Sequence, residues 1–103
     1  MPESAQPAGV LERLRSAEYR AVGTHQTVKA IQRGRARLVV VASDADRRVV
    51  QEVLAAGRER GLEIVEVGSM KELGRACGIA VGAAAAAVLG PPDAPGPESP
   101  YNR

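Results

Sequence analysis

Five polar side chains recur at helical spacing between Val22 and Arg37 of this 103-residue chain. At about 100° per residue they fall within an arc of roughly 120°, and the apolar residues and threonines between them fall on the opposite side. Amides present a donor beside an acceptor and cations attract phosphate, so this face suits a nucleic acid. The polar set is His25, Gln26, Lys29, Gln32 and Arg33, and the opposite set is Thr24, Thr27, Val28 and Ile31.

The start of this helix carries a second signal. Gly23 follows the apolar Val22 and permits close backbone approach, so the free N–H groups of the first turn can point at an anion. Gln26 could present a donor and an acceptor together to a base edge. An ordinary polar first turn is the alternative interpretation.

Positive charge is concentrated in the same region. The net charge is only +2, but the segment 20–37 holds five cations and no carboxylate, whereas the segment 49–90 holds four cations and five acids. A local basic patch favours a polyanionic partner, because each neutralised phosphate releases counterions. Solvated surface charge is the simpler explanation. The five cations are Arg20, Lys29, Arg33, Arg35 and Arg37.

Signals for catalysis or metal binding are weak. The single cysteine, Cys77, excludes an intramolecular disulfide and a cysteine-based zinc site within one chain, and we expect it to be a small buried residue. A thiol nucleophile with His25 as its base is the alternative. The cluster Ser43, Asp44 and Asp46 is most simply a helix cap, with a metal site or catalytic acid as the sharper alternative. The chain shows neither a phosphate-binding loop of the Walker type nor a dinucleotide glycine pattern.

The two ends differ from the middle of the chain. Residues 1–9 and the proline-rich residues 91–103 contain too few large apolar residues to form a core, so we expect a flexible N-terminus and a disordered tail, either of which could instead be a docking peptide. One domain at residues 10–90 remains. No apolar segment approaches the roughly 20 residues of a membrane span, which predicts a soluble, cytoplasmic protein.

Helices and strands alternate along this domain. Hydrophobic periodicity and caps predict helices at Val10–Glu18, from Gly23, at about Asp46–Arg60, and from a capping box at Ser69 and Glu72. The third of these helices should bury Val49, Val50, Val53, Leu54 and Gly57. Continuous or alternating apolar runs predict strands at Arg37–Ser43 and Leu62–Val67. The last element, Val81–Gly90, has five consecutive alanines that favour a helix, yet small residues also suit a crowded strand between helical layers.

Two motifs resemble a known family. The segment GTHQTVKAIQRG resembles the RNA-contacting helix of the kink-turn-binding ribosomal proteins, the family of large-subunit ribosomal protein seven-Ae. The segment SMKELGRACGIAVGAA resembles that family's second contact region, a short helix followed by an apolar loop that touches the flipped-out nucleotide of the kink. The resemblance covers roughly Leu11 to Leu89 and is closest to the small bacterial members. It implies an α/β fold, a three-layer α/β/α sandwich with a small mixed β-sheet, in which the alanine-rich element is a strand.

The resemblance also implies a set of RNA-binding residues. In the first region Gly23 and Thr24 would bring the helix end against the RNA backbone, Gln26 would read a guanine edge at the sheared G·A pairs, and Lys29 would meet phosphate or a base edge. In the second region Cys77 and Gly78 would fix the approach of the apolar loop. The complete expected set is Gly23, Thr24, His25, Gln26, Lys29, Arg33, Cys77, Gly78, Ile79, Ala80 and Val81.

Two residues depart from the family pattern. His25 stands where archaeal members have Asn and bacterial members mostly have Lys, and Ala80 stands where many members have an acid. A neutral imidazole attracts RNA less than a lysine does, so we expect lower affinity, or affinity that rises at acid pH. Ala80 removes a repulsive charge and also a base contact.

These observations predict a non-enzymatic protein, without cofactor or metal, that recognises and stabilises kink-turns in structured RNA, in the ribosome or in a riboswitch. A kink opens the A-form major groove, so a helix end can reach bases that are otherwise inaccessible. The chain has no Trp or Phe and only Tyr19 and Tyr101, so it lacks the stacking platform of single-strand binders. We expect a monomer. A protein–protein interaction module of the same fold is the main alternative, and an RNA-delivering fragment of a modifying enzyme is another.

Overall fold

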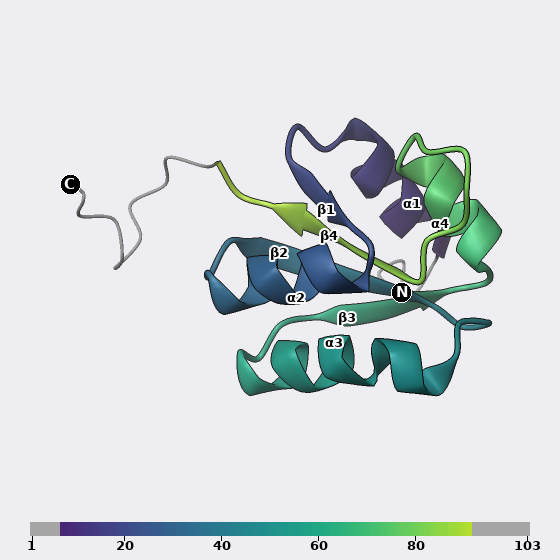
Figure 1. Cartoon of the computed structure of the whole chain (residues 1–103). Helices are drawn as coiled ribbons and strands as arrows, with labels where there is room; N and C mark the ends of the chain where they lie inside the picture. The colour runs from purple at the N-terminus through teal and green to yellow at the C-terminus, as the bar shows by residue number, and fades with distance from the viewer. Residues whose placement is uncertain (1–6, 92–103) are drawn as a thin grey trace, which may run out of the picture.

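A computed structural model describes residues 7–91 of the chain, and within them four helices alternate with four strands (Figure 1). In chain order they are α1 (Pro7–Ser16), β1 (Arg20–Val22), α2 (Thr24–Gln32), β2 (Ala36–Ala42), α3 (Arg47–Glu59), β3 (Ile64–Val67), α4 (Met70–Ala76) and β4 (Ala85–Leu89).

The strands form one mixed sheet in the order β1-β4-β2-β3. β2 and β3 are parallel, whereas β4 is antiparallel to both of its neighbours, β1 and β2. Helices α2 and α3 cover one face of the sheet, and α1 and α4 cover the other (Figure 1). The expected three-layer α/β/α sandwich is therefore confirmed.

Strand β2 explains why the sheet needs cover on both faces. Leu38 and Val40 belong to the hydrophobic core beneath α1 and α4, and Val39 and Val41 belong to the core beneath α2 and α3. All four side chains are almost completely buried. A strand buried on both faces is a continuous apolar run, which is the pattern that predicted it.

The alanine-rich element is a strand, as expected, although it spans only Ala85–Leu89. Ala85 and Ala87 face α2 and α3, Ala86 faces α1 and α4, and all three are completely buried. β4 lies between two other strands and under helices on both faces, so packing in this crowded layer outweighs the helix propensity of alanine.

Several boundaries differ from the expectations. Helix α1 begins at Pro7, inside the N-terminal stretch expected to be flexible, so the boundary at residue 9 was set too late, and α1 ends at Ser16 rather than Glu18. Strand β1 was not expected. Most of the expected N-terminal stretch (residues 1–6) and of the tail (residues 92–103) lies outside the described residues.

The expectation that Val49 is buried was wrong. Its side chain is 47% exposed, whereas Val50, Val53 and Gly57 are buried. Because α3 begins only at Arg47, Val49 lies in its first turn, about 70° from the centre of the buried stripe.

The expected caps are present. Asp46 accepts a hydrogen bond from the backbone N–H of Arg48 at 2.9 Å, and Ser69 accepts one from the N–H of Glu72 at 3.0 Å. Asp44 accepts from the N–H of Met70 at 2.8 Å and so joins the end of β2 to the start of α4. Between residues 7 and 91 there is no group of three or more His, Cys, Asp or Glu residues that could hold a metal ion. In the same range no helix has the length and apolar character of a membrane span.

Candidate nucleic-acid interface

Helix α2 has the two faces that its sequence predicts. The side chains of Thr27, Val28 and Ile31 are buried against the sheet, together with Ala30, while Thr24 is only half-buried. The five polar side chains of the other face, His25, Gln26, Lys29, Gln32 and Arg33, are all exposed.

The start of α2 presents free backbone donors. Gly23 has φ 95° and ψ 157°, a conformation that disfavours residues with a Cβ. Its own N–H donates to the carbonyl of Ala85 at 2.8 Å, and the first helical bond runs from the N–H of Thr27 to the carbonyl of Gly23 at 3.0 Å. The N–H groups of residues 24–26 thus have no intrahelical acceptor, and within the described chain no side chain caps the helix. These donors and the positive end of the helix dipole favour an anion.

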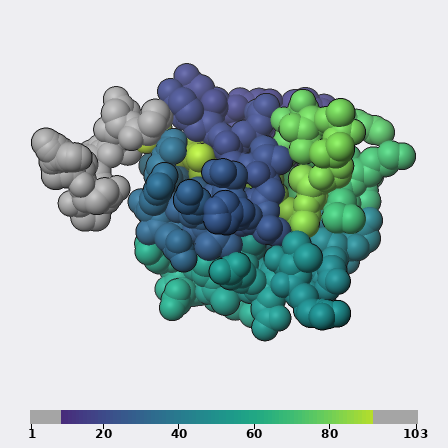
Figure 2. All heavy atoms as spheres, in the orientation of Figure 1, coloured from purple at the N-terminus to yellow at the C-terminus, as the bar shows by residue number. Residues whose placement is uncertain are grey.

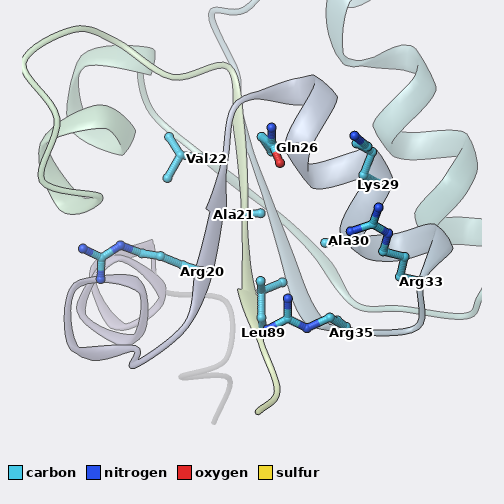
Figure 3. Close-up of a pocket in the computed structure, with 9 residues that line it drawn as sticks. All are labelled: Arg20, Ala21, Val22, Gln26, Lys29, Ala30, Arg33, Arg35 and Leu89. Atoms are coloured by element: carbon cyan, nitrogen blue, oxygen red, sulfur yellow. The ribbon is translucent and has the colours of Figure 1, made fainter. Parts of the chain in front are cut away.

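A groove of about 420 Å³ runs between α2 and the edge strand β1. Gln26, Lys29 and Arg33 follow one another along its α2 side, and Arg35 lies at its far end (Figure 3). Among residues 7–91 the one side-chain ion pair joins Glu12 and Arg15 at 3.6 Å. The groove cations are therefore not neutralised by any described carboxylate, and the groove is electropositive.

Arg20 has a structural role that its sequence did not reveal. Its guanidinium donates to the carbonyls of Leu14 (3.1 Å), Ala17 (3.2 Å) and Cys77 (3.2 Å), so it joins the C-terminal ends of α1 and α4. Figure 3 shows its side chain directed away from Gln26 and Lys29. Arg20 lines the groove and belongs to the local basic patch, but these donors are used inside the fold.

The second predicted region is an exposed apolar loop after α4. Val81 is 70% exposed and Ile79 is 37% exposed, and Gly78 and Ala80 are also exposed. Gly78 has φ 78°, which turns the chain out of the helix. Backbone hydrogen bonds of 3.0 Å from Ile79 N to Gly74 O and from Ala83 N to Met70 O hold both ends of the loop against α4.

Cys77 is buried beneath this loop with 4% exposure. Burial raises the pKa of its thiol, an effect that the nearby Arg20 guanidinium partly opposes. Its backbone carbonyl, held by Arg20, anchors the start of the loop. The alternative of a thiol nucleophile is not supported, because a buried thiol with a raised pKa carries little thiolate.

A second groove, of about 600 Å³, lies between the loop and α4. Lys71 and Arg75 are exposed on α4 and line it together with Ile79 and Val81. Sequence reasoning missed these two cations, although their spacing of four residues in the helix after Ser69 puts both on one face.

The two predicted regions lie at the same end of the sheet. Val22 pairs with Ala86 at the start of β4, and the next residue, Gly23, donates to Ala85. The segment leading from the loop into β4 lies beside the start of α2 in both the ribbon and the space-filling view (Figures 1 and 2). The strand pairing thus joins the polar start of α2 and the apolar loop, which are far apart in sequence, on one surface.

Comparisons with known proteins agree with this architecture. The chain is 46% identical over 78 residues to an RNA-binding protein of Geobacillus thermodenitrificans, covering 76% of this chain and 95% of that protein. It is 45% identical over 73 residues to the large ribosomal subunit protein eL8 of Halobacterium salinarum, covering 70% and 61% of the two chains. A solved structure, the Giardia lamblia 15.5kD RNA binding protein, matches with a TM-score of 0.74 and 27% identity over 89% of this chain and 86% of that one.

A family model matches residues 7–95, which include every element of the fold and both regions of the candidate interface. With that match and the similarity to the small bacterial relative, this chain belongs to the ribosomal protein L7Ae/L30e/S12e/Gadd45 family.

Proposed function

We propose that this protein binds structured RNA and recognises the kink-turn, without catalysing a reaction. The observation that carries the proposal is the juxtaposition of the uncapped, donor-rich start of α2 with an exposed apolar loop at the same end of the sheet. Family membership and relatives named RNA-binding proteins support the RNA partner.

The two regions have complementary roles in this proposal. A kink-turn opens the RNA groove and exposes the edges of sheared G·A pairs, which a regular A-form helix hides. The free N–H groups after Gly23 approach the RNA backbone, Gln26 reads a guanine edge, and Lys29 binds phosphate or an adjacent base. His25 adds a donor at the same helix end.

The loop recognises a different feature of the kink. Ile79, Ala80 and Val81 offer apolar contact to an extruded nucleotide, while Gly78 and the buried Cys77 fix where the loop lies. Such a nucleotide is unstacked and has apolar ring faces to bury. A single copy of the chain is sufficient, because it carries both regions. The RNA that it binds is ribosomal RNA or a riboswitch, and this binding takes place in the cytoplasm.

Titration of the purified protein near physiological salt tests this function. One RNA contains a kink-turn, and its control has the sheared G·A pairs replaced by Watson–Crick pairs. We expect tight binding to the first RNA and weak binding to the second. Equal, salt-sensitive binding to both RNAs would show a non-specific basic surface instead.

A protein–protein interaction module is the second candidate, favoured by the 70% exposure of the apolar Val81. Salt distinguishes the two functions, because RNA binding weakens steeply as salt rises and an apolar interface does not. Lys29→Ala should weaken binding to RNA and leave an apolar protein contact unchanged.

A further inference from the structure

The C-terminal end of α2 is unusually well satisfied by hydrogen bonds. Gly34, with φ 76°, lets the N–H groups of Gly34 and Arg35 donate back to the carbonyls of Ile31 and Ala30, each at 3.0 Å. The guanidinium of Arg60 donates to the carbonyl of Gln32 at 2.9 Å. A helix C-terminus normally repels phosphate, but here its carbonyls are paired and positive charge surrounds them.

Two arginines at this end extend the groove beyond the residues proposed to read the kink. Arg33 caps α2 and is exposed, whereas Arg35 is half-buried and its Nη2 donates to the carbonyl of Gly90 at 3.3 Å. The backbone N–H of Gly90 in turn donates to the carbonyl of Arg35 at 2.9 Å. Arg35 is thus held between α2 and the end of β4, so little conformational entropy is lost when it binds a ligand.

The groove is continuous from Gln26 to these arginines. Gln26 and Lys29 line its first part, and Arg33 and Arg35 line its last part (Figure 3). The nine residues of α2 span about 13 Å at 1.5 Å per residue. Glu18 lines a neighbouring groove on the other side of Arg35, together with Arg20.

We propose that Arg33 and Arg35 bind backbone phosphates of the base-paired stem that continues from the kink, an inference that rests on the proposed function. In the proposed complex the kink is bound at the start of α2. An RNA that follows the groove from there continues as a base-paired stem past the C-terminal end of α2. A stem presents regularly spaced phosphates and no unpaired base edges. Two guanidinium groups that have no acidic partner among residues 7–91 match that chemistry. These two residues add affinity and orientation, while Gln26 and Lys29 discriminate the kink.

Stem length provides the test. The RNAs share one kink-turn; in the long RNA both stems extend about twelve base pairs, and in two shortened RNAs one or the other stem is cut to the pairs beside the kink. We expect the double variant R33A/R35Q to bind the long RNA roughly tenfold more weakly than the wild-type protein does. Its slope of log K against log salt should be smaller by about two, one for each lost phosphate contact. On the shortened RNA that lacks the contacted stem, the affinities of the variant and of the wild-type protein should agree within about twofold.

The control is R13A/R15A, which removes the same charge from exposed positions on α1, on the opposite face of the sheet. We expect its affinity to stay close to that of the wild-type protein on the long RNA and on both shortened RNAs. Thermal unfolding checks that each variant is folded. R33A alone serves as a second variant if R35Q disturbs the fold, and its salt slope should then be smaller by about one.

The proposed stem contact would be overturned if R33A/R35Q lost the same affinity on the long RNA and on both shortened RNAs, or lost no affinity on any of them. An equal loss in R13A/R15A would do so as well, because the effect would then be one of net charge. If the wild-type protein failed to distinguish kinked from unkinked RNA while the arginine effect still depended on stem length, the stem contact would stand and kink recognition would fail.

Discussion

At the scale of single residues, the groove along α2 is lined by residues that would read the RNA and by residues that would attract it. Gln26 and Lys29 lie near the uncapped start of the helix, where the free backbone donors are. Arg33 and Arg35 lie at the other end of the same groove. The effects of substitutions along this groove should therefore differ in size, and also in whether they change the reading of the RNA or its electrostatic attraction.

Gln26→Ala and Lys29→Ala should each weaken binding to kink-turn RNA by roughly 1 to 3 kcal/mol, because each removes a directed or charge-assisted contact. Arg35→Ala should cost less and should act mainly through the salt dependence of binding. Titrations at several salt concentrations measure both effects. Equal losses from all three substitutions would contradict the roles assigned to them.

His25 is the residue whose substitution we expect to raise the affinity for RNA. It is exposed in the first turn of α2, beside the free backbone donors. His25→Lys adds a full positive charge at neutral pH, so we expect it to raise the affinity for kink-turn RNA several-fold and to steepen the salt dependence by about one phosphate contact. Unchanged affinity in the same titration would mean that the His25 side chain does not face the RNA.

At the scale of elements, the apolar loop depends on the absence of a side chain at Gly74. A Cβ built at this position would collide with the backbone carbonyl of Val81. Gly74 also accepts the N–H of Ile79 and lies buried in α4. The glycine therefore allows the loop to lie directly on the helix.

Gly74→Ala should push the loop away from α4, weaken binding to kink-turn RNA and lower the stability of the domain by roughly 1 to 3 kcal/mol, as overpacking does. RNA titration and thermal unfolding measure the two effects. Gly9→Ala is the matched control, because a Cβ at that exposed position of α1 meets nothing within 4 Å. If both variants behaved alike, the close contact between loop and helix would be unimportant.

At the scale of the whole molecule, the stability of the domain depends on the sheet, which helices cover on both faces. Val40 lies in the central strand β2 with 0% exposure, in the core beneath α1 and α4. Val40→Asp would bury a carboxyl group without a partner, at a cost of several kcal/mol that is comparable to the total stability of a small domain. We expect loss of cooperative unfolding in circular dichroism, whereas Arg47→Ala on the surface of α3 should leave it intact. A folded V40D variant that lost only RNA binding would contradict the position of β2.

Much of this architecture can be predicted from local patterns in the sequence. Strand β2 follows from its valine run, and the polar face of α2 follows from its periodicity, because both depend on residues that are neighbours along the chain. The caps at Asp46 and Ser69 are similarly local. The strand at Ala85–Leu89 did not follow from propensity, which favours a helix there, and required the family resemblance.

The sequence by itself thus determined the helices, the strands β2 and β3, most of their buried sides and the polar face of α2, since these depend on the spacing of nearby residues. Only the tertiary structure decided that Gly23 lies beside Ala85, which joins two distant segments into one surface, and that Arg20, which lines the groove, also holds two helix ends together. The short edge strand β1 also became visible only through its pairing with β4. Contacts of this kind depend on which strands pair and which helices share a face, and no local pattern encodes them.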